Sequence, residues 1–119
     1  MSSFTRVAEI AELPDGTMKK VTVGEKEILI ARSGSRYFAA DDRCPHMNGD
    51  LSLGTLSGTV VTCPVHHSQF DLTDGRVVRW TDFTGFKLSA AKLLKSPKPL
   101  TTHEIKVEGN GIFVALKEG

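Results

Sequence analysis

The sequence predicts an all-β fold, and three observations lead to that prediction. Apolar and polar residues alternate over short runs, turn residues such as Gly, Pro, Asn and Asp separate those runs, and only one segment has the spacing of a helix. With 119 residues the chain has the length of a single domain, residues 1–119, and can bury a core without disulfide bonds.

Strands joined by tight turns are expected in the first third of the chain. Pro14-Asp15-Gly16 is a turn signal, because proline fixes φ, aspartate hydrogen-bonds the backbone and glycine accepts a positive φ. Valines and isoleucines occupy every second position on both sides of Gly24, which predicts a hairpin there. The expected strands are Phe4–Glu9, Met18–Val23, Glu27–Arg32 and Arg36–Ala40.

Shorter strands are expected in the second half. Thr73-Asp74-Gly75 predicts a tight turn, and the Asn-Gly pair within Gly109-Asn110-Gly111 is the strongest local signal for a hairpin. The expected strands are Thr59–Thr62, Gln69–Leu72, Arg76–Arg79, His103–Glu108 and Ile112–Leu116.

Two segments depart from this pattern. Residues 41–58 are dense in Asp, Gly, Ser and Pro and are expected to form an ordered loop. Residues 80–99 contain apolar residues at helical spacing, which predicts one short helix near 89–94, ended by Pro97 and Pro99.

The charge balance excludes several classes of partner. A formal net charge of +1, from 15 basic and 14 acidic residues, gives the chain no general attraction for nucleic acid or an anionic membrane. No apolar run approaches the roughly 18–20 residues that span a bilayer, and the N-terminal residues lack the features of a signal peptide. We therefore expect a cytoplasmic protein without nucleic-acid or membrane partners.

The candidate metal ligands form two short motifs, Cys44-Pro45-His46 and Cys63-Pro64-Val65-His66, with 16 residues between His46 and Cys63. Two thiolates and two imidazoles suit either tetrahedral zinc or an iron–sulfur cluster. A zinc finger takes both sulfurs from one loop, whereas here each loop supplies one Cys and one His. In a cluster of two irons, both thiolates can bind one iron and both imidazoles the other. Glycines at 49, 54 and 58 are expected to let the backbone bend around the metal.

This pattern resembles the Cys-x-His…Cys-x-x-His motif of Rieske iron–sulfur proteins. The resemblance extends to further positions, which are Leu51-Ser52, Gly54, Gly58, Val61, Phe70-Asp71-Leu72 and Asp74-Gly75. It implies stacked antiparallel sheets with a two-loop cluster-binding subdomain, the loops covering about 42–53 and 62–71. It also implies one [2Fe-2S] cluster per chain, bound by Cys44, His46, Cys63 and His66.

Departures from the high-potential members of this family concern the surroundings of the cluster. Those members carry one extra Cys in each loop, joined as a disulfide, at positions that match Gly49 and Val65. They also donate hydroxyl hydrogen bonds from a Ser and a Tyr, which match Ser68 and Phe70. Because donors aimed at sulfur stabilise the reduced cluster, losing one donor and the disulfide predicts a potential in the lower part of the Rieske range.

The resemblance implies a soluble one-electron carrier, a Rieske-type ferredoxin, that passes electrons from a flavin-containing reductase to a terminal oxygenase. The sequence shows no nucleophile–base pair, phosphate-binding glycine motif or carboxylate pair, so we do not expect an enzyme. The alternatives are a small subunit of an oxidoreductase that resembles nitrite reductase, and a structural zinc-binding module. A monomer is the simplest expectation for a mobile carrier.

Three further features have simpler interpretations. His67 is interpreted as a solvated loop side chain, and His103 is given no role. Residues 80–99 are interpreted as a flap over the apolar side of a sheet, with a docking surface for a redox partner as the alternative.

Overall fold

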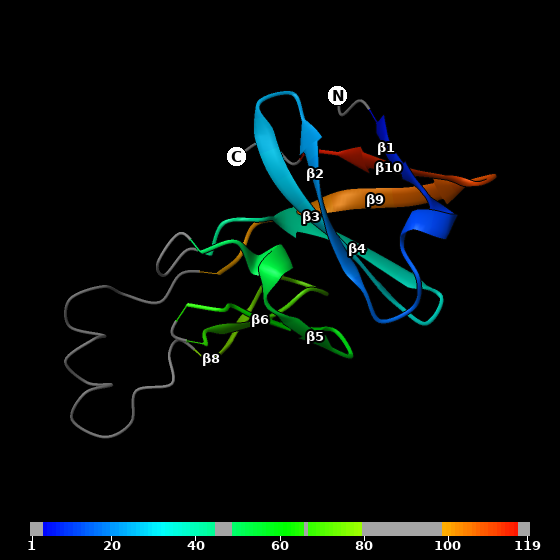
Figure 1. Cartoon of the computed structure of the whole chain (residues 1–119). Helices are drawn as coiled ribbons and strands as arrows, with labels where there is room; N and C mark the ends of the chain where they lie inside the picture. The colour runs from blue at the N-terminus through cyan, green and yellow to red at the C-terminus, as the bar shows by residue number, and fades with distance from the viewer. Residues whose placement is uncertain (1–3, 45–48, 66, 80–98, 117–119) are drawn as a thin grey trace, which may run out of the picture.

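Two antiparallel sheets make up the fold (Figure 1). The computed structural model describes residues 4–44, 49–65, 67–79 and 99–116. The six-stranded sheet has the order β1 (Thr5–Glu9), β10 (Gly111–Ala115), β9 (Thr102–Glu108), β4 (Arg36–Asp41), β3 (Lys26–Ser33) and β2 (Met18–Val23). The four-stranded sheet has the order β5 (Thr55–Ser57), β6 (Val60–Thr62), β7 (Gln69–Asp71) and β8 (Val77–Arg79). Two 3₁₀ turns complete it, η1 (Ile10–Glu12) and η2 (Leu51–Leu53).

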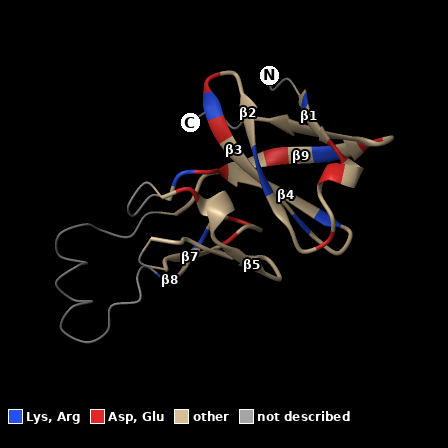
Figure 2. Ribbon diagram, viewed as in Figure 1, with Lys and Arg blue, Asp and Glu red and all other residues tan. Residues whose placement is uncertain are grey.

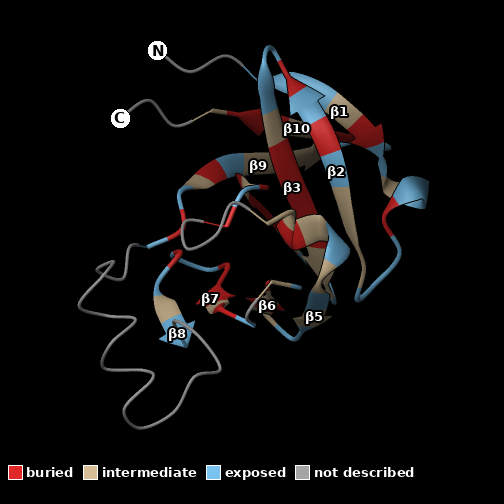
Figure 3. Cartoon of the chain, turned by 60° about the vertical axis from the view of Figure 1, so that its left-hand side comes forward, coloured by how far each residue is buried: buried red, intermediate tan, exposed pale blue. Residues whose placement is uncertain are grey.

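Strand β3, which lies between β4 and the edge strand β2, is buried on both faces, which is why it lacks the polar alternation of β2 (Figure 3). Ile28 and Ile30 belong to a core formed within the six-stranded sheet, with residues from β1, β2 and β10. Leu29 and Ala31 point the other way, into a second core shared with the four-stranded sheet. Successive strand side chains point to opposite faces, so β3 contributes to both cores. The smaller sheet is therefore held to the larger one through β3 and β4.

The hairpin turns follow the sequence prediction, with one shift in register. Val23 pairs with Lys26 across Gly24 and Glu25, as the valine and isoleucine pattern predicts. At the C-terminal hairpin Glu108 pairs with Gly111, so the loop consists of Gly109 and Asn110, one residue before the Asn-Gly pair. Gly109 has a φ of +58°, which fits a two-residue turn that needs glycine at its first position.

The all-β prediction is confirmed, and one segment within it is corrected. Residues 41–58 are not loop throughout, because they contain η2 and the short strand β5. Strand β5 has a single apolar residue, Leu56, so alternation could not reveal it; its pairing with β6 holds it in the sheet. The helix predicted near 89–94 lies outside the described residues. Within the described parts of the chain, no helix has the length and apolar character needed to cross a membrane.

Candidate metal centre

The two cysteines of the predicted motifs are buried in the core between the two sheets, one in each predicted ligand loop. Cys44 follows β4 and Cys63 follows β6, and neither exposes any surface. Both are free thiols, and both belong to the core between the two sheets. Burial raises the pKa of the Cys63 thiol to about 11, and a contact with Cys44 adds to the shift. The tertiary structure thus brings together the two cysteines that the sequence singled out.

Backbone hydrogen bonds close both cysteine-containing loops. The Cys44 N–H donates to the Gly49 carbonyl at 2.9 Å, and the Cys63 N–H donates to the Ser68 carbonyl at 2.7 Å. The Val65 N–H lies 3.4 Å from Cys63 Sγ and donates to it. Such a donor stabilises negative charge on the sulfur, as a bound thiolate requires. The other two predicted ligands, His46 and His66, lie outside the described residues.

Close approach explains Gly49 and Gly54 better than bending does. A Cβ on Gly49 would lie 2.9 Å from Cys63 Sγ and 2.9 Å from Val65 Cγ2, so the second loop occupies that space. A Cβ on Gly54 would overlap the Thr62 carbonyl oxygen. Neither glycine has a positive φ, in contrast to Gly58, which does sit in a turn with a φ of +59°. Of the three, Gly58 is the one whose positive φ favours glycine, and it lies in the turn between β5 and β6.

The residues expected to tune the centre are buried with the cysteines. Ser68 and Phe70 expose no surface, and Phe70 packs in the core that contains both thiols. Gly49 and Val65, the positions that the resemblance matches to the extra cysteines of high-potential proteins, lie close together, since a Cβ on Gly49 would come within 2.9 Å of Val65 Cγ2.

Sequence analysis missed a set of charged groups at the base of the first loop. Asp42 is fully buried, and Lys20 from β2 contacts Asp42, Asp50 and Glu27. These four residues lie far apart in the sequence and form no motif, so only the fold reveals their association. Burial raises the pKa of Asp42, and hydrogen bonds from Ser52 offset part of that shift.

His103, to which sequence analysis gave no role, also has a charged neighbour. Its Nε2 lies 2.7 Å from Asp41 Oδ1, and its side chain is fully buried. This contact joins β9 to the end of β4, next to the pairing of His103 with Ala39. His103 therefore serves the packing of the larger sheet.

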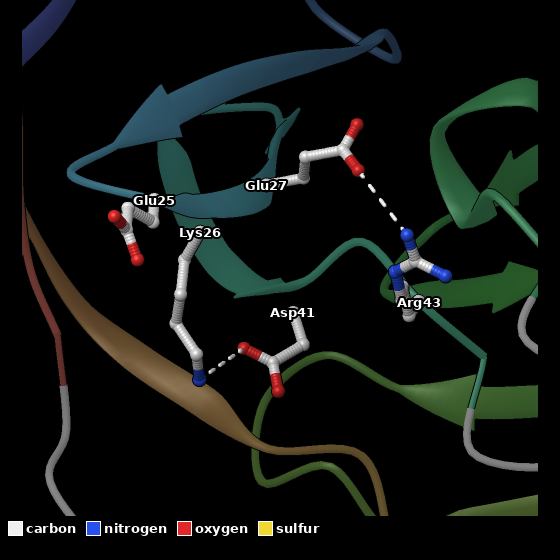
Figure 4. Close-up of a pocket in the computed structure, with 5 residues that line it drawn as sticks. All are labelled: Glu25, Lys26, Glu27, Asp41 and Arg43. Carbon is white, nitrogen blue, oxygen red and sulfur yellow. Dashed lines mark hydrogen bonds and ion pairs between the residues drawn. The ribbon is translucent and has the colours of Figure 1, made fainter.

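A charged pocket opens beside the first loop (Figure 4). It encloses about 210 Å³ and is lined by Glu25, Lys26, Glu27, Asp41 and Arg43. Lys26 Nζ lies 3.5 Å from Asp41 Oδ1, and Arg43 Nη2 lies 3.7 Å from Glu27 Oε1, so both cations have carboxylate partners. Acidic and basic segments also alternate along β3 and β9 (Figure 2). The described lining of this pocket includes no nucleophile beside a base.

Taken together, two antiparallel sheets and two adjoining loops with paired, buried thiols define a small β protein with a metal centre. Comparison with known protein families identifies the family. Residues 3–88 match the family described as Rieske [2Fe-2S] domain. The chain therefore belongs to the Rieske family, and one [2Fe-2S] cluster per chain is the cofactor of this domain.

Relatives and solved structures agree with this assignment. The ferredoxin component of biphenyl 2,3-dioxygenase from Rhodococcus jostii (strain RHA1) is 30% identical over 117 residues, covering 98% of this chain and 96% of that protein. The ferredoxin of carbazole 1,9a-dioxygenase from Nocardioides aromaticivorans IC177 has the same fold, with a TM-score of 0.79, 24% identity and coverage of 97% and 99%. A chain in a complex of reduced oxygenase and oxidized ferredoxin in carbazole 1,9a-dioxygenase gives a TM-score of 0.76 at 26% identity, covering 97% of this chain and 95% of that one.

The described residues fit the thiolate half of such a cluster. A Rieske centre needs two cysteine sulfurs on one iron, and here two free thiols from different loops are in contact. Within the described residues, no group of three or more His, Cys, Asp and Glu side chains offers another metal site. The two thiols are thus the place in the described chain where the family's cofactor fits.

Proposed function

We propose that the chain is a one-electron carrier that takes electrons from a flavin-containing reductase and delivers them to a terminal oxygenase. In this proposal the chain is a cytoplasmic monomer and a single domain, residues 1–119. Cys44, His46, Cys63 and His66 bind the cluster through loops at about 42–53 and 62–71. The observation that carries the proposal is the placement of two buried, free thiols from the two loops in one core, with Gly49 of the first loop packed against Cys63 Sγ of the second.

The cluster supplies reversible one-electron chemistry, and the protein sets the conditions for it. With the cluster bound, Cys63 would bind iron as a thiolate, and the Val65 N–H, 3.4 Å from Cys63 Sγ, would stabilise the negative charge on that sulfur. Phe70, Leu51 and Val61 are fully buried in the surrounding core and exclude water from the sulfur side.

Two observations favour a carrier over the alternatives. The relative and the structures named above are ferredoxins of dioxygenase systems, which supports a carrier more than a subunit resembling that of nitrite reductase. The Rieske assignment gives no support to a structural zinc module.

Metal analysis and electron paramagnetic resonance test the ligand set. We expect two irons and two sulfides per chain and, after dithionite reduction, a rhombic signal with an average g below the free-electron value. Cys44→Ser and His66→Ala should each abolish that signal, whereas His67→Ala and His103→Gln should keep it. A colourless protein that contains zinc after anaerobic purification would refute the proposal.

Electron transfer is tested separately with the oxygenase component of a biphenyl 2,3-dioxygenase as the acceptor. The reduced chain should be reoxidised under anaerobic conditions at a rate that rises with oxygenase concentration. Reoxidation no faster than in buffer would leave the cluster assignment intact and reject this class of acceptor.

A further inference from the structure

Asp42 is a fully buried carboxylate immediately after β4, two residues before Cys44. Acidic side chains are rarely buried in this way unless they are hydrogen-bonded or paired, because a charge loses its hydration on burial. Asp42 accepts two hydrogen bonds from Ser52, from the N–H at 2.7 Å and from the hydroxyl at 3.0 Å. Ser52 lies in η2, near the C-terminal end of the first loop, so the carboxylate joins the two ends of that loop.

The backbone of Asp42 makes the same connection. Its carbonyl accepts a hydrogen bond from the Leu51 N–H at 2.8 Å, and its own N–H donates to the Glu27 carbonyl on β3 at 3.2 Å. Immediately inside this closure, Arg43 and Asp50 form an isolated antiparallel bridge. The residues that enclose the candidate ligands Cys44 and His46 are therefore fixed at both ends to the larger sheet.

Lys20 compensates the buried charge. Its Nζ lies 3.6 Å from Asp42 Oδ2, 3.0 Å from Asp50 Oδ2 and 2.9 Å from Glu27 Oε2. Through this cation β2 and β3 contact both ends of the first loop. A buried carboxylate with two donors and a cation beside it is favourable only while all its partners keep their places. The arrangement therefore favours one conformation of the loop.

We propose that Asp42 is the positioning residue for the first cluster-binding loop, holding Cys44 in register with the second loop through Ser52 and Lys20. This inference rests on the ligand set proposed above. It assigns to Asp42 and Ser52 a role in retaining the cluster, in addition to their contribution to the stability of the fold.

The chain offers a matched control in Asp71. This carboxylate is also buried, and it accepts hydrogen bonds from the Thr73 N–H at 3.0 Å and the Thr73 hydroxyl at 2.7 Å, with Arg76 Nη2 at 3.0 Å. It lies at the end of β7, at the last position of the second loop and eight residues after Cys63, and its partners Thr73 and Arg76 close the turn towards β8, away from the ligands. Replacing Asp71 thus removes the same chemistry from a different place.

The experiment measures iron release from the purified holoprotein to an excess of a ferrous chelator, together with the paramagnetic resonance spectrum of the reduced protein. Temperatures are set at the same interval below each variant's unfolding midpoint. We expect Asp42→Asn to release iron at least tenfold faster than wild type and to shift or broaden the g values. Ser52→Ala should release iron severalfold faster, Ser52→Thr at the wild-type rate, and Asp71→Asn within about twofold of wild type with an unchanged spectrum.

Equal release rates for Asp42→Asn and Asp71→Asn, or a wild-type rate and spectrum for Asp42→Asn, would overturn the proposal. If Asp42→Asn does not accumulate, Ser52→Ala decides the question against Ser52→Thr, because only the alanine lacks the hydroxyl. Wild-type protein that retains no iron would instead refute the ligand assignment, and with it the positioning role of Asp42.

Discussion

At the scale of single residues, several positions in the two loops are buried or small. Cys44, Cys63 and Phe70 expose no surface, and Gly49 leaves room for the Cys63 sulfur. His67 is exposed and has a φ of +57°, the one positive φ found for a non-glycine residue in the described chain. The left-handed conformation is unfavourable for a residue with a Cβ, so the loop holds His67 in place against its local preference.

Replacing His67 with glycine should therefore stabilise the protein. We expect the free energy of unfolding to rise by about 0.5–1 kcal/mol, because glycine accepts this φ without the steric cost. Denaturant unfolding followed by circular dichroism measures the change. His67→Ala removes the imidazole but keeps the unfavourable φ, so an equal gain from alanine would contradict this explanation.

Phe70→Tyr should raise the reduction potential. A hydroxyl in the core beside the thiols can donate to a cluster sulfur and stabilise the reduced state. A hydrogen bond worth about 1 kcal/mol corresponds to roughly 40 mV for one electron. Protein-film voltammetry gives the value, and Phe113→Tyr makes the same change on β10, outside that core, as a control. An unchanged or lower potential in Phe70→Tyr would show that position 70 does not tune the cluster.

At the scale of elements, close contacts at two glycines set the distance between the two loops. Gly49 lies against the side chains of Cys63 and Val65, and Gly54 lies against the Thr62 carbonyl, directly before Cys63. The backbone of the first loop thus approaches side chains of the second loop at Gly49 and the backbone of β6 at Gly54. This arrangement explains how two short loops can bring their thiols into contact.

Gly54→Ala should destabilise the protein by about 2–3 kcal/mol, because its Cβ would overlap a backbone oxygen that cannot move without disturbing β6. Thermal unfolding of Gly54→Ala and of the control variant Gly58→Ala measures the loss of stability in each. At Gly58 no atom lies within 4 Å of the added Cβ, so only the positive φ opposes alanine and a loss of about 1 kcal/mol is expected. Equal losses of stability in the two variants would contradict the explanation that overlap of the added Cβ with the Thr62 carbonyl oxygen makes Gly54→Ala the more destabilising change.

The turn between β7 and β8 predicts how stability depends on pH. Hydrogen bonds from the Thr73 N–H and hydroxyl lower the pKa of Asp71 below its usual 3.8. A lowered pKa in the folded state stabilises the protein above the unfolded-state value, and that stability is lost as the pH falls through the lower folded value. At pH 7, Asp71→Asn should therefore reduce the free energy of unfolding by about 1–3 kcal/mol. Unfolding measured from pH 6 to 2.5 should show the deficit shrinking below pH 4; a constant deficit would contradict this role.

For the whole molecule, the important division lies between two cores. One core lies within the six-stranded sheet and contains neither cysteine, whereas the other joins the two sheets and contains both. The four-stranded sheet buries its apolar residues only in the second core, through residues such as Val61 and Phe70. Its stability should therefore depend on the metal centre more than that of the larger sheet does.

Removal of the cluster should affect the two sheets unequally. Hydrogen exchange of holo and apo protein, followed by mass spectrometry, should show protection in β6 and β7 falling at least tenfold, which corresponds to about 1.4 kcal/mol. Protection in β2 and β3 should change less than threefold. Loss of protection that is equal in both sheets would mean that the molecule unfolds as one cooperative unit.

The sequence by itself determined the all-β class, the strands of the larger sheet and the family. The alternation of apolar and polar residues and the turn residues are local properties of the sequence. The Cys-x-His and Cys-x-x-His spacings can likewise be recognised without knowledge of the fold. The position of Phe70 in the motif was also readable, although its burial was not. Strand β5 was missed, because three residues with one apolar side chain carry no periodic signal.

Only the tertiary structure decided which distant residues meet. Three associations join segments that are not adjacent in the sequence. Cys63 shares a core with Cys44, Gly54 packs on the Thr62 carbonyl, and Asp42 contacts both Lys20 and Ser52. Their partners are chosen by strand order and register, which depend on how the two cores are buried. The free-energy cost of burying a carboxylate depends on which partners surround it. The role of Asp42 is therefore a property of the fold and not of its neighbours in the sequence.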